Sequence, residues 1–102
     1  MPFVALEKLH LLYDGYRKPL KLAGEDLLLS QEGGKTLLIK NRCPHAGAAL
    51  TYATCDNHHL RCPVHGIEFD LVSGRSRSPV CANALQFLPL IYEGNSVGVD
   101  LR

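Results

Sequence analysis

The chain is short and nearly neutral, and both properties exclude classes of protein. Its 102 residues suffice for one domain with a modest hydrophobic core. A net charge of +1 gives no electrostatic basis for binding nucleic acid or an anionic membrane. The sequence shows no signal-peptide pattern and no run near the roughly 20 apolar residues of a membrane helix. We therefore expect a single cytoplasmic domain, residues 1–102, without nucleic acid or membrane contacts.

The N-terminal part of the chain predicts short β-strands. Residues 7–15 fit either a helical turn or a loop, and a turn follows at Asp14-Gly15. Two apolar runs then flank Gly33-Gly34, which is the pattern of a β-hairpin. The strands expected here are residues 3–6, 19–22, 27–31 and 36–40.

The C-terminal part also predicts strands, and no segment has a sustained helical period. Pro89 interrupts one apolar run, which predicts an edge strand or a bulge there. The strands expected here are residues 58–62, 67–71, 85–92 and 97–101. Short strands separated by turns predict an all-β fold, either a sandwich or a barrel.

Two segments between these strands each combine a cysteine with a histidine. They are Cys43-Pro44-His45 and Cys62-Pro63-Val64-His65. The surrounding residues 43–50 are rich in proline, glycine and alanine and have no periodicity, which predicts a loop. Thiolates and imidazoles brought together form a metal site. Cys43, His45, Cys62 and His65 are therefore the candidate metal ligands.

The donor set leaves alternatives open. Two cysteines and two histidines also suit tetrahedral zinc, although zinc fingers usually place the two cysteines together and the two histidines together. Cys55 and Cys81 are left outside the motif, either as buried thiols or as a disulfide.

The order of the ligands, Cys-x-His followed by Cys-x2-His, resembles the Rieske family. The resemblance implies a [2Fe–2S] cluster with both cysteines on one iron and both histidines on the other. It also implies a Rieske fold, in which an antiparallel sandwich or barrel-like base carries a small inserted cluster-binding lobe. On this basis the base is residues 1–41 and 70–102, and the lobe is residues 42–69.

Several positions differ from the respiratory-complex members of that family. Ala48 and Val64 occupy the places of an extra cysteine pair, while Ile67 and Phe69 replace a serine and a tyrosine. Without those hydroxyl donors the reduced cluster is less stabilised, so we expect a low potential, on the order of −150 mV. The resemblance is then to the soluble ferredoxins of bacterial aromatic-ring oxygenase systems. Phe69 and Tyr52 are expected in the core of the lobe.

No further constellation of polar residues points to a substrate site, so we expect an electron-transfer protein and no enzyme. The resemblance implies that it carries one electron from a flavin-dependent reductase to a terminal oxygenase through transient contacts. Two alternatives stay open: a small subunit of an assimilatory nitrite reductase, and a zinc-stabilised interaction module. The sequence names neither the donor nor the acceptor.

Overall fold

Antiparallel β-sheets make up almost all of the regular structure, which confirms the all-β prediction. The computed structural model describes residues 3–43, 49–56, 59–63, 66–76 and 84–100. The elements in chain order are β1 (Phe3–Lys8), the 3-10 turn η1 (Leu9–Leu11), β2 (Tyr16–Leu22), β3 (Glu25–Glu32), β4 (Lys35–Lys40), β5 (Thr54–Asp56), β6 (His59–Arg61), β7 (Glu68–Asp70), β8 (Phe87–Leu88), β9 (Ile91–Glu93) and β10 (Ser96–Asp100). In these described ranges no helix is long and apolar enough to cross a membrane.

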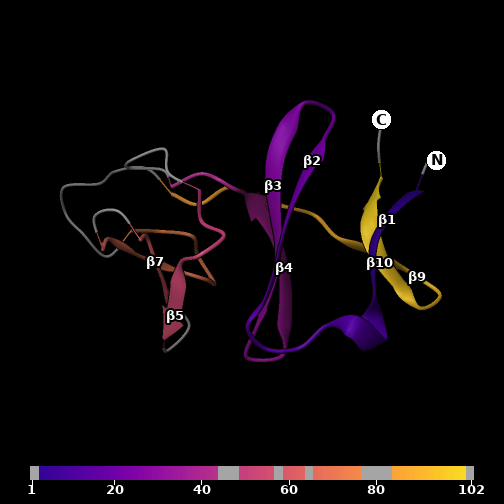
Figure 1. Cartoon of the computed structure of the whole chain (residues 1–102), viewed down its shortest axis with the longest axis horizontal. Helices are drawn as coiled ribbons and strands as arrows, with labels where there is room; N and C mark the ends of the chain where they lie inside the picture. The colour runs from indigo at the N-terminus through magenta and orange to yellow at the C-terminus, as the bar shows by residue number, and fades with distance from the viewer. Residues whose placement is uncertain (1–2, 44–48, 57–58, 64–65, 77–83, 101–102) are drawn as a thin grey trace.

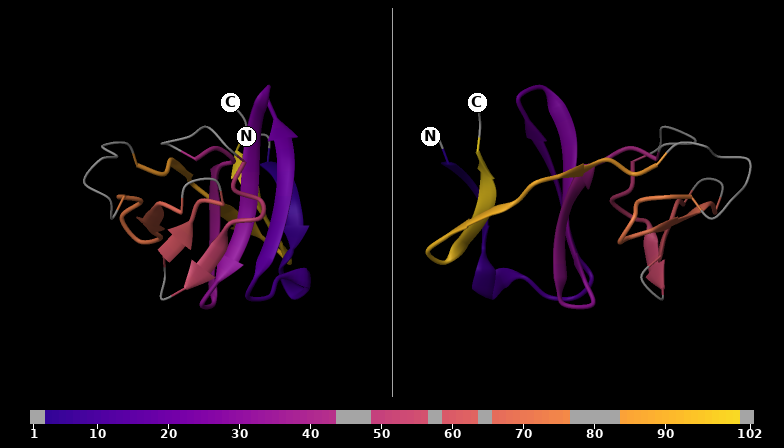
Figure 2. Two further views of the ribbon diagram at one scale, coloured as in Figure 1. Left: turned by 60° about the vertical axis from the view of Figure 1, so that its left-hand side comes forward. Right: turned by 180° about the vertical axis from the view of Figure 1, so that it is seen from behind.

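The molecule measures 41 × 27 × 20 Å, and its three sheets follow one another along the longest dimension. One end holds β1-β10-β9, the centre holds β2-β3-β4-β8, and the other end holds β5-β6-β7 (Figure 1). The right-hand view in Figure 2 shows the same succession from behind. The two ends of the described chain meet in the first sheet, where Phe3 pairs with Asp100.

The central sheet is buried on both of its faces. Leu27 and Leu29 of β3 belong to the hydrophobic cluster shared with the β1-β10-β9 sheet. Leu28, between them, belongs to a second cluster, shared with the residues around β5, β6 and β7. Successive side chains of a strand point to opposite faces, so three adjacent leucines supply two different cores.

The predicted hairpin around Gly33-Gly34 is confirmed by the pairing of β3 with β4, in which Leu29 lies opposite Leu38. The first predicted strand is confirmed as β1. Residues 9–11 take the helical turn that the sequence left open. Strand β5 was missed, because its Thr-Cys-Asp sequence has no apolar alternation.

The expected strand over residues 85–92 is wrong as a continuous element. It divides at Pro89 into β8, which pairs with β4, and β9, which pairs with β10. Proline has no backbone N–H to donate to a ladder, so the strand leaves one sheet and enters the next there. The C-terminal hairpin of β9 with β10 is confirmed. Leu85 lies just before this crossing and packs in the cluster around β5, β6 and β7, so one segment touches all three sheets.

Candidate metal centre

The two candidate cysteine ligands are buried in the same hydrophobic cluster. Cys43 follows β4 and Cys62 follows β6, and each is 1% exposed. Their cluster also contains Leu28 and Ile39 from the central sheet. The fold therefore brings together two cysteines from separate loops, with their thiols shielded from water.

The loop after β6 is closed by its own backbone. The Cys62 N–H donates to the Ile67 carbonyl oxygen at 2.9 Å, and the Gly66 N–H donates to the Cys62 carbonyl oxygen at 3.0 Å. Gly66 has φ +67°, a conformation that favours glycine. A Cβ at Gly66 would lie 3.0 Å from Nη2 of Arg61, so the Arg61 guanidinium packs against this loop.

The loop after β4 is closed by a side chain instead. Asn41 Oδ1 accepts a hydrogen bond from the Leu50 N–H at 2.7 Å, and Asn41 Nδ2 donates to Thr51 Oγ1 at 2.9 Å. The Asn41 N–H itself donates to the Asp26 carbonyl oxygen of β3 at 2.9 Å, just past the end of β4. Asn41 thus ties the far end of the loop to the strand from which the loop departs.

The side chains expected to form the lobe core divide between the interior and the surface. Phe69 is fully buried, as predicted, and pairs with Leu60 across β6 and β7. Ile67 is also buried. Tyr52 was predicted in the core, and that is wrong: it is 87% exposed. Tyr52 occupies a turn just after Leu50, and the Leu50 and Ala53 side chains are the ones buried in the core there.

The histidines of the motif, His45 and His65, lie outside the described residues, as do Ala48, Val64 and Cys81. In the described ranges no three His, Cys, Asp or Glu side chains gather in a metal-binding group. The two cysteines that are described suit the thiolate side of a [2Fe–2S] cluster, which is held by cysteine sulfur and shielded from solvent. Cys55 is half-buried and packs against the hydrophobic cluster that contains Cys43 and Cys62, and a disulfide with Cys81 falls outside the described residues.

Sequence patterns missed two residues that attach the β5-β6-β7 end to the central sheet. Asn41 carries a weak signal, because asparagine at a strand end often bonds to nearby backbone. Arg17 carries none. Its Nη2 donates to the Ala53 carbonyl oxygen at 3.1 Å, across 36 positions of sequence.

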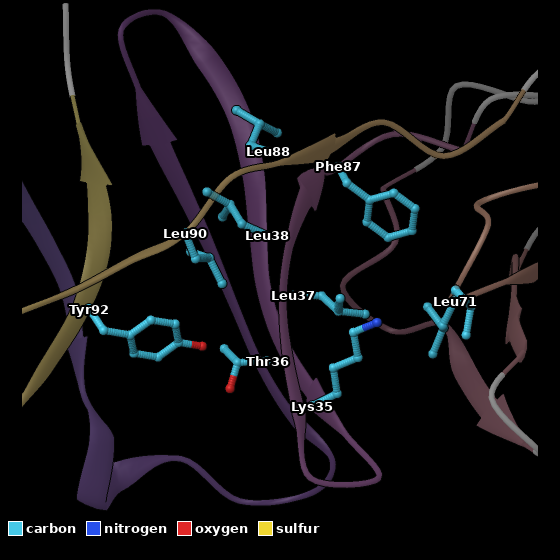
Figure 3. Close-up of a pocket in the computed structure, with 10 residues that line it drawn as sticks. Lys35, Thr36, Leu37, Leu38, Leu71, Phe87, Leu88, Leu90 and Tyr92 are labelled. Carbon is cyan, nitrogen blue, oxygen red and sulfur yellow. The ribbon is translucent and has the colours of Figure 1, made fainter.

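A shallow apolar groove of about 270 Å³ lies between the central sheet and its neighbours on either side (Figure 3). Phe87 and Leu71 line one end of the groove. At the opposite end, Tyr92 and Thr36 point toward each other (Figure 3). Among the described residues that line the groove there is no carboxylate, histidine or cysteine.

Comparison with known sequences places these features in a family. The family described as "Rieske [2Fe-2S] domain" matches residues 2–89. The ferredoxin component of the naphthalene 1,2-dioxygenase system from Pseudomonas aeruginosa is 27% identical over 78 residues, which cover 76% of this chain and 75% of that protein. The methylxanthine N1-demethylase NdmA of Pseudomonas putida is 31% identical over 65 residues. That match covers 64% of this chain but only 18% of the demethylase.

Solved structures share the fold over the whole length. The ferredoxin of Sphingomonas yanoikuyae superposes with a TM-score of 0.84 at 24% identity, covering 99% of this chain and all of that one. The ferredoxin of carbazole 1,9a-dioxygenase from Nocardioides aromaticivorans gives 0.83 at 21% identity, with both chains fully covered. The relatives matched over most of their length are named ferredoxin components of dioxygenase systems, not catalytic subunits. With the family match spanning nearly all of its length, this chain belongs to the Rieske [2Fe–2S] domain family.

Proposed function

We propose that this chain is a one-electron carrier that holds a Rieske [2Fe–2S] cluster on Cys43, His45, Cys62 and His65. The observation that carries the proposal is that Cys43 and Cys62 are buried in one hydrophobic cluster of side chains. Each of them stands at the start of a loop whose sequence contains a histidine. When bound, the cluster supplies a site that accepts and releases one electron. The residues of the chain hold it, exclude water and fix the two loops.

We further propose a low reduction potential, on the order of −150 mV. Ile67 and Phe69 are both buried in the hydrophobic cluster that contains Cys43 and Cys62, and neither side chain carries a hydroxyl group. Hydrogen bonds to cluster sulfur stabilise the reduced, more negative state. Their absence at these two positions supports a potential at the lower end for this ligand type. A redox titration giving a midpoint well above zero would contradict this part of the proposal.

For partners, we propose a flavin-dependent reductase as electron donor and a terminal oxygenase as acceptor. The support is the name of the Pseudomonas aeruginosa relative, a ferredoxin component of a dioxygenase system. A solved complex of the oxygenase and ferredoxin of carbazole 1,9a-dioxygenase contains a chain of the same fold, with a TM-score of 0.79. Stopped-flow mixing of reduced protein with candidate oxygenases measures the transfer directly.

The division into a cluster-binding lobe, residues 42–69, and a base, residues 1–41 and 70–102, stays a proposal. The separate β5-β6-β7 sheet supports it. Limited proteolysis after removal of iron tests it, because cleavage should concentrate in the lobe. The cytoplasmic location also stays a prediction, which cell fractionation tests.

The visible spectrum and the EPR spectrum of the dithionite-reduced protein test the cluster itself. We expect a red-brown protein with two iron and two sulfide per chain and a rhombic signal after one-electron reduction. A colourless protein containing one zinc per chain would instead establish the zinc-stabilised module.

Ligand variants test the four residues. Cys43→Ser and Cys62→Ser should abolish the visible absorption, and Cys55→Ser should retain it as the matched control. His45→Ala and His65→Ala should lose the mixed-ligand EPR signal, while His10→Ala, on the exposed 3-10 turn, should keep it. Full cluster content in Cys43→Ser would refute the assignment.

A further inference from the structure

The two ligand loops are closed by different kinds of hydrogen bond. The loop from Cys62 to Ile67 is closed by backbone hydrogen bonds continuous with the pairing of β6 and β7. The loop from Cys43 to Leu50 lies between β4 and a turn, and its two ends do not pair as strands. The side chain of Asn41 joins its two ends.

We propose that Asn41 is a positioning residue for the first ligand loop, and that its side chain helps to hold Cys43 in place for the [2Fe–2S] cluster. This inference rests on the proposed function. Asn41 precedes Cys43 by two positions, and its amide spans the loop to reach Leu50 and Thr51. The loop is therefore fixed at both ends by one residue.

The amide group suits this role because both of its polar ends are used. Oδ1 accepts from the Leu50 N–H at 2.7 Å, and Nδ2 donates to Thr51 Oγ1 at 2.9 Å. Leu50 is fully buried, so its N–H needs a protein partner in place of water. The Asn41 N–H is bonded to the Asp26 carbonyl oxygen, which fixes the Asn41 backbone on the central sheet.

The turn that receives the Asn41 side chain is itself well held. The Ala53 N–H donates to the Leu50 carbonyl oxygen at 3.0 Å, and the Ala53 carbonyl oxygen accepts from Arg17. Removing the Asn41 amide should therefore release the loop between the strand and the turn, while the turn itself stays attached. The expected defect is in holding the cluster more than in folding.

The experiment measures how fast the purified, cluster-loaded protein loses its visible absorption to an excess of an iron chelator. Asn41→Ala should lose absorption about tenfold faster than the unsubstituted protein, because two hydrogen bonds at the loop are lost. Asn41→Asp should stay near the unsubstituted rate. Its carboxylate accepts from the Leu50 N–H and, with the Thr51 hydroxyl rotated, from that group as well.

Thr36→Val provides the matched control. Thr36 Oγ1 donates to Gln31 Oε1 at 3.2 Å within the β3-β4 hairpin, so the variant removes a hydrogen bond of the same kind away from the ligand loop. Thr51→Val removes one of the two Asn41 contacts and should give an intermediate rate, which also serves if Asn41→Ala does not fold. Reduced-state EPR should change in Asn41→Ala and not in Thr36→Val.

Each outcome decides the proposal. Fast loss in Asn41→Ala with rescue in Asn41→Asp supports it. Unchanged loss in Asn41→Ala, or in Thr51→Val where Asn41→Ala does not fold, overturns it. Equal acceleration in Thr36→Val, or no rescue in Asn41→Asp, also overturns it, because the effect would then be one of general stability or of charge. Failure of the proposed function gives a different result, since the unsubstituted protein would then carry no iron–sulfur absorption at all.

Discussion

Arg17 of β2 donates a hydrogen bond from Nη2 to the carbonyl oxygen of Ala53, and so joins the central sheet to the turn that follows the first ligand loop. The same guanidinium forms an ion pair with Glu32 of β3 and donates to Ser30 Oγ at 3.3 Å. The Arg17 and Glu32 side chains are only 12% and 16% exposed. A mostly buried charge pair with further hydrogen bonds makes a directional attachment. Removing only one of the two charges is costly, because the other charge is then left buried without a partner.

We expect Arg17→Met to lower the free energy of unfolding by about 3 kcal/mol, because it leaves the Glu32 carboxylate buried without its partner. Urea unfolding followed by circular dichroism measures the change. The double variant Arg17→Met/Glu32→Leu should recover most of the loss. Lys18→Met, one position along the same strand, is the control. Its contact with Glu7 is 3.8 Å and the Lys18 side chain is 46% exposed, so a change below about 1 kcal/mol is expected. Equal effects at the two positions would show that Arg17 is not a special attachment.

Glu7 and Tyr16 should make the stability of the folded protein depend on pH at both extremes. The Tyr16 hydroxyl donates to Glu7 Oε2 at 2.5 Å, and this bond is the main cause that lowers the pKa of Glu7 below its ordinary value of 4.5. Burial, and then the same hydrogen bond, raise the pKa of Tyr16 above its ordinary value of 10.0. The folded state thus favours an ionised Glu7 and a neutral Tyr16.

The two shifts act in separate pH windows. The contribution of Glu7 is complete above pH 4.5 and is lost as the pH falls through its lowered folded pKa. That of Tyr16 is complete below pH 10.0 and is lost as the pH rises through its raised folded pKa. Tyr16→Phe should therefore unfold more easily at neutral pH and lose less stability than the unsubstituted protein toward either extreme. Tyr13→Phe is the control, since it keeps the edge-on ring contact with Tyr16. Parallel stability profiles for Tyr16→Phe and the unsubstituted protein would contradict the assignment.

Leu28 and Leu29 are adjacent and both fully buried, yet they belong to different cores. Each substitution to alanine should lower the free energy of unfolding by about 2–5 kcal/mol. We expect only Leu28→Ala to accelerate the loss of visible absorption to a chelator, because Leu28 packs in the same hydrophobic cluster as Cys43 and Cys62. Leu29→Ala is the matched control. Equal acceleration in both variants would mean that retention of the [2Fe–2S] cluster depends only on the overall stability of the fold.

Gly98 permits the close approach of β10 to β1. A Cβ at this position would lie 2.0 Å from the Val4 carbonyl oxygen, a backbone atom that has no room to move within the sheet. Gly98→Ala should therefore destabilise the fold by more than about 3 kcal/mol in urea unfolding. Gly94→Ala is the control. Its φ of +57° is strained for alanine but no atom lies within 4 Å, so about 1–2 kcal/mol is expected. A Gly98→Ala variant no less stable than Gly94→Ala would refute the contact.

The sequence by itself determined most of the strands and the candidate ligands of this protein. The β3-β4 hairpin follows from two apolar runs around Gly33-Gly34, because the turn and the pairing are local. The four candidate ligands follow from residue type and order, since thiolates and imidazoles are uncommon and chemically distinct donors. Of these, the structure describes Cys43 and Cys62 and buries both.

Only the tertiary structure decided which face each residue serves and what joins the sheets. Leu27, Leu28 and Leu29 are identical in the sequence, and their division between two cores depends on which sheets pack on either side. The break at Pro89 marks a passage between sheets, where the sequence indicated only an edge or a bulge. The bond from Arg17 to Ala53 spans 36 positions and has no local pattern. Strand formation depends on near neighbours in the chain, whereas packing depends on residues that only the completed fold brings together.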